Sequence, residues 1–329
     1  MVSTVKAFGM SNKKFLSKET LKNGITILKG AFAGFSDDKA MKLSASLAYY
    51  TVFSLAPLLL IIISLAGIFL GKDAIQGRVF SEINGLVGNQ AAGQIQEMIK
   101  NLQVSGQSTV SVIIGFVTLL VGATSVFGEM QDSINTIWRV KAKPKRGWVK
   151  LIKDRLLSSS LIISIGFLLI VSLIVNGALL ALSDKLQSIF PDITVVIFNI
   201  INAVISFLVI AVLFGVIFKV LPDVKISWSD VRAGALFTAL LFMLGRVVIG
   251  IYIQKSSTGS AYGAAGSLII ILLWVYYTAA ILYFGAEFTR AYAEFTGARI
   301  APADYAVHVE QKESEKEVDA LPTQNMKKN

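Results

Sequence analysis

The residues best suited to chemistry in this sequence are charged side chains inside or beside long apolar stretches. Arg246 is the single charge in residues 233–253, and Glu287 follows 31 uncharged residues in the stretch 256–290. A charge at the centre of a bilayer costs at least about 2.5–3.5 kcal/mol, so Arg246 is expected to face a bundle interior, water or a partner, or to snorkel outward. Such an arginine suits an anionic substrate. An acidic group such as Glu287 suits proton transfer or exclusion of the wrong substrate.

Acidic and aromatic residues near the ends of other apolar stretches complete the candidate site. Glu129 and Asp132 end the stretch 108–128, and with Asn135 they recur every three residues on one side of a helix. If these elements pack together, they line a polar, aromatic vestibule. The alternative is a set of ordinary residues at headgroup level. The predicted substrate pathway comprises Arg246, Glu287, Glu129, Asp132, Tyr49, Tyr50, Tyr276 and Tyr277.

Other polar residues inside the apolar stretches favour a structural role. Asn199 and Asn202 are three residues apart and share a helix face, and Asn176 lies in another apolar stretch. Buried amides usually pair across membrane helices, which predicts that these three hold helices together. Pro57 removes one backbone donor and is expected to kink the first apolar helix.

The sequence also limits the kinds of site that the protein can contain. It has no cysteine, and its one histidine, His308, lies in a polar tail. Disulfides, thiol nucleophiles and histidine-based catalytic or metal sites within the membrane are therefore excluded. The carboxylates of Glu129, Asp132 and Glu287 are the remaining side chains that could bind a metal. We expect no catalytic residue, no metal, no cofactor and no enzymatic activity.

Composition predicts an all-α, polytopic membrane protein, because 54% of the residues are hydrophobic and only 16% are charged. Residues 43–295 are expected to form a domain of six transmembrane helices. Residues 1–42 predict a basic amphipathic helix on the membrane surface, and amphipathic surface helices are also expected in 72–107. Residues 296–329 are expected to be a polar, disordered tail. The predicted spans are 43–71, 108–128, 156–182, 193–218, 231–253 and 256–290.

The positions of lysine and arginine predict the orientation of these spans. Segments predicted to lie inside hold 19 basic residues, against 5 in segments predicted to lie outside. This asymmetry places the N- and C-termini in the cytoplasm and the protein in a cytoplasmic membrane. The net charge of +10 is then explained by membrane orientation, so no nucleic-acid partner is expected.

Four motifs, in order, resemble the YihY/BrkB family of bacterial inner-membrane proteins. They are ASLAYYTVFSLAPLLL at 45–60, FGEMQDSINTIW at 127–138, LPDVKISWSDVRAGALFTALLF at 221–242 and YGAAGSLIIILLWVYYTAAILYFGAEFT at 262–289. The resemblance covers about residues 30–295 and implies six transmembrane helices in the bacterial inner membrane. Proteins of this kind were once labelled ribonuclease BN, and others have been discussed as serum-resistance factors or as transporters, including of lipid-like substrates.

Three functions are compatible with these observations. The favoured hypothesis is a transporter or flippase-like protein whose partners are membrane lipids and an anionic, amphiphilic substrate. The second is a structural or accessory membrane protein without a substrate, which would tolerate loss of Arg246 and Glu287. The third is the ribonuclease of the old label, which is disfavoured because phosphodiester hydrolysis usually needs clustered carboxylates or histidines. The sequence does not predict the oligomeric state.

Overall fold

The computed structural model describes residues 18–54, 122, 125–143, 191–255, 266–298 and 300–310, with isolated helical positions at 77, 80, 92, 93, 95–97 and 100. The predicted kink at Pro57 and the amide of Asn176 lie outside these described residues. Residues 40–54 and 125–137 are helical. They contain the start of the first predicted span and the polar segment that follows the second.

Three long apolar helices dominate the described part of the chain. They are α7 (Pro191–Val220), α8 (Trp228–Lys255) and α10 (Gly266–Thr296), with 30, 28 and 31 residues. At about 1.5 Å per residue each helix is longer than the roughly 30 Å thickness of a bilayer's hydrocarbon core. The prediction of an all-α membrane protein is confirmed, and these helices correspond to the last three predicted spans. Their apolar segments are Val196–Val220, Trp228–Ile253 and Leu268–Thr296.

Two helix boundaries differ from the predicted ones. α8 begins at Trp228 rather than at residue 231, because Ser227 caps it: its carbonyl accepts from the Val231 amide and its hydroxyl from the Asp230 amide. α10 continues to Thr296, past the predicted end at residue 290. The charged residues near that end are bound by other parts of the protein, so they do not have to terminate the helix at the membrane surface.

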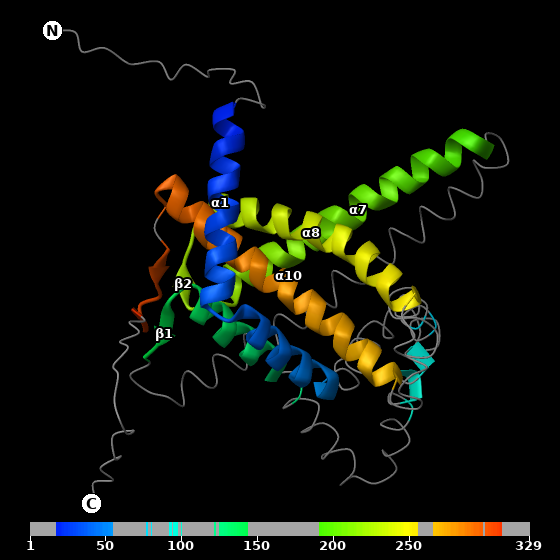
Figure 1. Ribbon diagram of the computed structural model, residues 1–329, viewed down its shortest axis with the longest axis horizontal. Coiled ribbons are helices and arrows are strands. Elements are labelled where there is room, and N and C mark those ends of the chain that lie inside the picture. The colour runs from blue at the N-terminus through cyan, green and yellow to red at the C-terminus, as the bar shows by residue number, and fades with distance from the viewer. Residues whose placement is uncertain are drawn as a thin grey trace, which may run out of the picture.

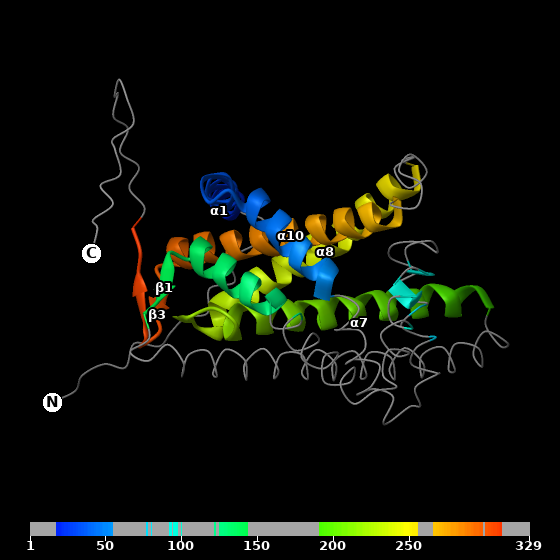
Figure 2. The same cartoon turned by 90° about the horizontal axis from the view of Figure 1, so that it is seen from below.

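The three long helices run in alternating directions and converge at one end (Figures 1 and 2). The short strands lie beyond this end, which we call the strand end. It holds the last residues of α7 and α10 and the first residues of α8. α7 diverges from α8 and α10 toward its own N-terminus in both views. Close packing of the three helices is therefore concentrated toward the strand end.

A reciprocal pair of glycines brings α8 and α10 together. A methyl group at Gly234 would lie 2.8 Å from Cβ of Thr289, and one at Gly285 would lie 2.8 Å from Cβ of Thr238. Both threonine hydroxyls donate to a backbone carbonyl one turn back, at 2.7 Å. Small residues allow this close approach, which is the main source of helix association where lipid supplies no hydrophobic drive.

The N-terminal helix α1 (Lys18–Asp37) crosses α10 near the strand end. It stands upright in Figure 1 and is seen almost along its axis in Figure 2, whereas α10 extends across both views. Phe32 and Phe35 contact the ring of Phe284 edge-on, with centroids 5.3 and 5.7 Å apart. α1 therefore packs across the last membrane helix instead of continuing in its direction.

A sharp turn separates α1 from the helix at 40–54. Lys39 has a positive φ of 52°, and its amide donates to the carbonyl of Ser36. The adjacent Asp38 is buried although it lies in a lysine-rich segment. The turn redirects the chain into the start of the first predicted span and places the Asp38 carboxylate at the strand end.

Four short strands close the strand end. β1 (Val140–Ala142) pairs with β4 (Ala306–His308), and β2 (Val224–Lys225) pairs with β3 (Ala301–Pro302), both antiparallel. The expectation of a disordered tail from residue 296 is therefore wrong for residues 301–308. Its backbone hydrogen bonds are satisfied by two loops that the sequence pattern did not identify as strands.

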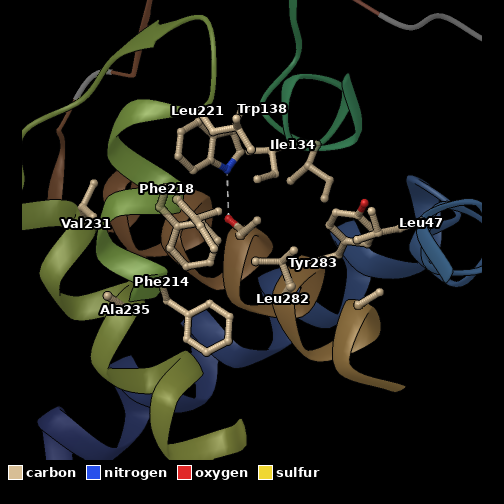
Figure 3. Close-up of a cluster of buried hydrophobic side chains, with 14 of the residues drawn as sticks. Leu47, Ile134, Trp138, Phe214, Phe218, Leu221, Val231, Ala235, Leu282 and Tyr283 are labelled. Atoms are coloured by element: carbon tan, nitrogen blue, oxygen red, sulfur yellow. Dashed lines mark hydrogen bonds between the residues drawn. The ribbon is translucent and has the colours of Figure 1, made fainter. Parts of the chain in front are cut away.

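A hydrophobic core joins the helices just inside this closure (Figure 3). Trp138 lies 6.5 Å from Phe218 between ring centroids, and Phe218 in turn stacks on Phe214. The indole Nε1 of Trp138 donates to the carbonyl of Ala286 at 3.0 Å, as the dashed line in Figure 3 shows. The helix at 125–137 is thereby anchored to α7 and α10.

Candidate functional site

Four charged side chains from three separate parts of the chain meet at the strand end. Asp38 follows α1, Arg139 follows the helix at 125–137, and Glu287 and Arg290 belong to α10. Arg139 Nη2 lies 2.6 Å from Asp38 Oδ1, and Arg290 Nη1 lies 3.2 Å from Asp38 Oδ2. Arg290 Nη2 lies 3.5 Å from Glu287 Oε2. We call these residues the four-charge cluster.

Local structure holds the two arginines in place. Arg139 has a positive φ of 57°, which ends the helix at 125–137 and turns its side chain toward α1. Arg290 also donates from Nη1 to the carbonyl of Ile137, one of the last carbonyls of that helix. A cation is favourable there because helix C-termini carry partial negative charge. One arginine therefore binds both a carboxylate and a helix end.

Glu287 is the most unusual member of the cluster. It is only 1% exposed, and neither carboxyl oxygen has a hydrogen-bond donor. Its carboxyl lies against Gly34 of α1, where an added methyl group would be 2.8 Å from Cδ. Burying a carboxylate without donors is costly. Such a group therefore points to a role beyond packing.

A second polar group next to the cluster ties the loops together. The buried carboxylate of Asp223 accepts from Gln131 Nε2 at 3.2 Å, Asn135 Nδ2 at 2.9 Å and the Tyr305 hydroxyl at 2.9 Å. Its backbone amide donates to Asn135 Oδ1 at 2.9 Å. A carboxylate that accepts several hydrogen bonds is well stabilised without a cation. We call this set the Asp223 junction, and it joins the α7–α8 loop to the C-terminal strands.

A cleft of about 500 Å³ opens beside these two polar groups. This volume is within the range of about 300–1,000 Å³ found for small-molecule sites. Its wall has two cationic side chains, one acidic side chain and several uncharged positions. The lining residues are Asp132, Asn135, Thr136, Arg139, Val140, Lys141, Ala142 and Val309. Arg139 belongs to both the cleft and the four-charge cluster.

The structure brings together only part of the predicted substrate pathway. Glu287 lies in the four-charge cluster and Asp132 lines the cleft, whereas Glu129 is half-buried on the same helix as Asp132. Arg246 is exposed and lies elsewhere, on α8. Its neighbour Gly245 packs against Tyr277, ten residues and about 15 Å before Glu287 on α10. Arg246 therefore does not lie next to Glu287, and its role in a substrate pathway stays a prediction.

The predicted tyrosines divide into two pairs. Tyr49 and Tyr50 are exposed on the helix at 40–54, with ring centroids 5.7 Å apart. Tyr276 and Tyr277 are half-buried on α10, and the Tyr276 hydroxyl lies 3.7 Å from the sulfur of Met41. These aromatic residues lie along the first and last membrane segments rather than around the cleft.

The asparagine side chains differ in their position and contacts. Asn202 is exposed on α7, so among the described residues it forms no buried bridge between helices, and its structural role stays a prediction. The side chain of Asn199 lies outside the described residues. The buried amide that does join separate segments is Asn135, which binds Asp223. Its position three residues after Asp132 was visible in the sequence, but its partner was not.

Sequence reasoning missed several members of the site. Asp38 was one of three acidic residues in a basic segment, and Asp223 was an ordinary loop residue after a proline. Tyr305 was assigned to the tail. An aspartate inside a lysine-rich amphipathic pattern is the one local signal that could have identified Asp38. Nothing in the spacing points to Asp223 or Tyr305, because their contact joins residues 82 positions apart.

Comparison with known proteins gives one family. A family model described as Virulence factor BrkB matches residues 31–307. A UPF0761 membrane protein of Alcanivorax borkumensis is 27% identical over 269 residues, which cover 79% of this chain and 59% of that protein. One from Vibrio vulnificus is 26% identical over 283 residues, 82% of this chain and 83% of that protein. No solved structure matches significantly.

Proposed function

Because this chain belongs to the BrkB family, whose relatives are UPF0761 membrane proteins, we propose that it moves, or helps to move, an anionic or lipid-like molecule across the bacterial inner membrane. In this proposal the chain is a multi-pass protein with six transmembrane helices. The strand end lies in the cytoplasm, as the excess of basic residues in its loops predicts. Its partners are the surrounding lipids and the transported molecule.

The observation that carries the proposal is the shared position of Arg139. This residue lines the cleft and, on its other side, is ion-paired at 2.6 Å with the buried Asp38. Asp38 in turn binds Arg290 of the last membrane helix. An anionic group that enters the cleft competes with Asp38 for Arg139, and this competition changes the contact between α1 and α10. Ligand binding and helix position are thereby linked.

The charge of the cleft supports an anionic group at its mouth. Arg139 and Lys141 supply two cations, against the single carboxylate of Asp132. α7 and α8 meet at the strand end, and both carry exposed apolar residues along their length. An amphiphile can place its charged group at the cleft and its apolar part in the lipid beside these helices.

The proposal includes no chemical conversion of the transported molecule. Among the described residues, no group of three or more histidine, cysteine or acidic side chains is arranged to hold a metal ion. The acidic residues considered for that role are divided between the buried cluster, the open cleft and the flank of the helix at 125–137.

Reconstitution into liposomes tests the proposal. Vesicles that carry a fluorescent phosphatidylglycerol analogue are treated with a membrane-impermeant quencher, and the rate at which inner-leaflet probe becomes accessible is measured. We expect wild-type protein to accelerate this exchange and Lys141→Gln to slow it. Lys225→Gln is the matched control, because Lys225 is an exposed lysine at the same end, paired with the exposed Asp304.

Two results contradict the proposal. The first is exchange no faster than in protein-free vesicles, and the second is exchange that Lys141→Gln leaves unchanged. The first result favours the structural or accessory function. The second shows that the cleft is not part of the route.

A further inference from the structure

The four-charge cluster contains two buried oxygen atoms without a hydrogen-bond donor, and both are carboxyl oxygens of Glu287. The carboxyl groups of Asp38 and Glu287 lie against the same guanidinium group, 3.2 Å from Nη1 and 3.5 Å from Nη2 of Arg290. Two ionised carboxylates so close together repel each other, and neither has a proton to donate. A single proton between them supplies the missing donor and removes the repulsion.

Charged groups from three separate parts of the chain surround Glu287. They are Asp38 from the turn after α1, Arg139 from the turn after the helix at 125–137, and Arg290 and Glu294 from α10. The two arginines balance the two buried carboxylates, and the carboxylate of Glu294 is largely exposed. The ionised form of Glu287 is therefore disfavoured by its burial and its lack of donors rather than by the net charge of the group.

The packing of α1 leaves space beside Glu287 for a proton but not for a metal ion. The backbone at Gly34 lies against the carboxyl of Glu287, so that even a methyl group there would be 2.8 Å from Cδ. Arg290 occupies another side of the same carboxyl, at 3.5 Å. A metal ion needs several oxygen ligands around it, and this contact leaves no space for them. A proton needs no such space.

We propose that Glu287 and Asp38 share one bound proton at the contact between α1 and α10. The proton lets α1 lie directly on the Glu287 side chain. Its release leaves an additional buried negative charge, which favours movement of α1 away from α10 and entry of water. A coupling of proton release to transport rests on the function proposed above. In that function the proton site links proton movement to opening at the cytoplasmic end.

Infrared difference spectroscopy tests proton binding without any transport assay. The carbonyl band of a protonated carboxyl group is separate from carboxylate bands and shifts in D₂O. We expect the purified wild-type protein at neutral pH to show this band and Glu287→Gln to lose it. Glu294→Gln is the matched control, because it removes a carboxylate from the same helix at a largely exposed position, and it is expected to keep the band.

Cysteine cross-linking tests the position of α1, and the absence of native cysteine makes the chain suitable. A Cβ at Gly30 would lie 3.6 Å from Cβ of Ala291, a separation that suits a disulfide. We expect the Gly30→Cys, Ala291→Cys pair to cross-link readily at neutral pH. Relative to a control pair, cross-linking should fall as the pH rises, and Glu287→Gln should abolish this fall.

The control pair corrects for the faster oxidation of thiols at high pH. Gly215→Cys and Ala235→Cys have the same 3.6 Å separation and join α7 to α8 rather than α1 to α10. Equal carboxyl bands in wild type and Glu287→Gln, with both eluting as folded protein, overturn the proposal. A band that disappears without any change in cross-linking supports the proton site and rejects its effect on α1. Failure of vesicle transport alone leaves both readouts intact.

Discussion

Thr238 of α8 packs directly on Gly285 of α10, so closely that a methyl group on the glycine would lie 2.8 Å from the threonine Cβ. Neither residue can move easily, because both are buried in the contact between two membrane helices. The same arrangement recurs one turn away with the roles of the helices exchanged, at Gly234 and Thr289. Helix approach at this crossing depends on glycine at two positions.

This contact predicts a large effect of one methyl group. Gly285→Ala should destabilise the protein by about 1–3 kcal/mol, because the added carbon forces α8 and α10 apart. Thermal unfolding in detergent measures the change. Gly250→Ala is the matched control, since nothing lies within 4 Å of a methyl group there. That variant should be as stable as wild type or slightly more stable, and equal loss in both variants contradicts the packing argument.

The four-charge cluster predicts that Asp38 is essential to stability. Asp38→Asn removes the carboxylate that both arginines share, and breaking a buried ion pair in this way costs about 3–5 kcal/mol. The arginines retain some exposure, so the lower half of that range is expected. Asp304→Asn, in an exposed ion pair with Lys225, should leave the unfolding transition unchanged. An unchanged transition for Asp38→Asn would show that the arginines find other partners.

The Asp223 junction predicts that the C-terminal strands depend on one hydroxyl group. Tyr305→Phe removes a donor to the buried carboxylate and should cost about 1–2 kcal/mol. The loss should be local, so cleavage by a protease near residues 301–308 should become faster while the helices remain resistant. Unchanged cleavage of this segment would mean that strand pairing alone holds it.

The exposed arginine in α8 keeps its predicted link to an anionic ligand. We expect Arg246→Ala to reduce the amount of anionic lipid retained in native mass spectrometry, with no change in thermal unfolding. Lys255→Ala is the control, because this lysine is exposed at the end of the same helix. Equal retention by wild type and Arg246→Ala would indicate an arginine that only snorkels to the membrane surface.

The sequence predicted the membrane class and the last three spans because those features depend on local composition. An apolar stretch longer than the bilayer is thick forms a helix wherever its neighbours lie, since lipid cannot satisfy backbone hydrogen bonds. The importance of Glu287 could be predicted for the same reason, as a charge at the end of a long uncharged stretch. The contact of Glu287 with Gly34 of α1 could not be predicted in this way, because the position of a residue on one helix does not specify which neighbour its face meets.

The sequence by itself determined which segments are apolar and where the excess of basic charge lies. Membrane insertion and orientation depend on these features, and both are properties of the residues within one segment. The tertiary structure alone decided that Asp38 meets Arg290, 252 residues away, and that the segment at 301–308 forms strands. These contacts depend on a turn at Lys39, on the lack of a side chain at Gly34 and on unpaired backbone groups in distant loops. Such requirements are met only after the helices have packed.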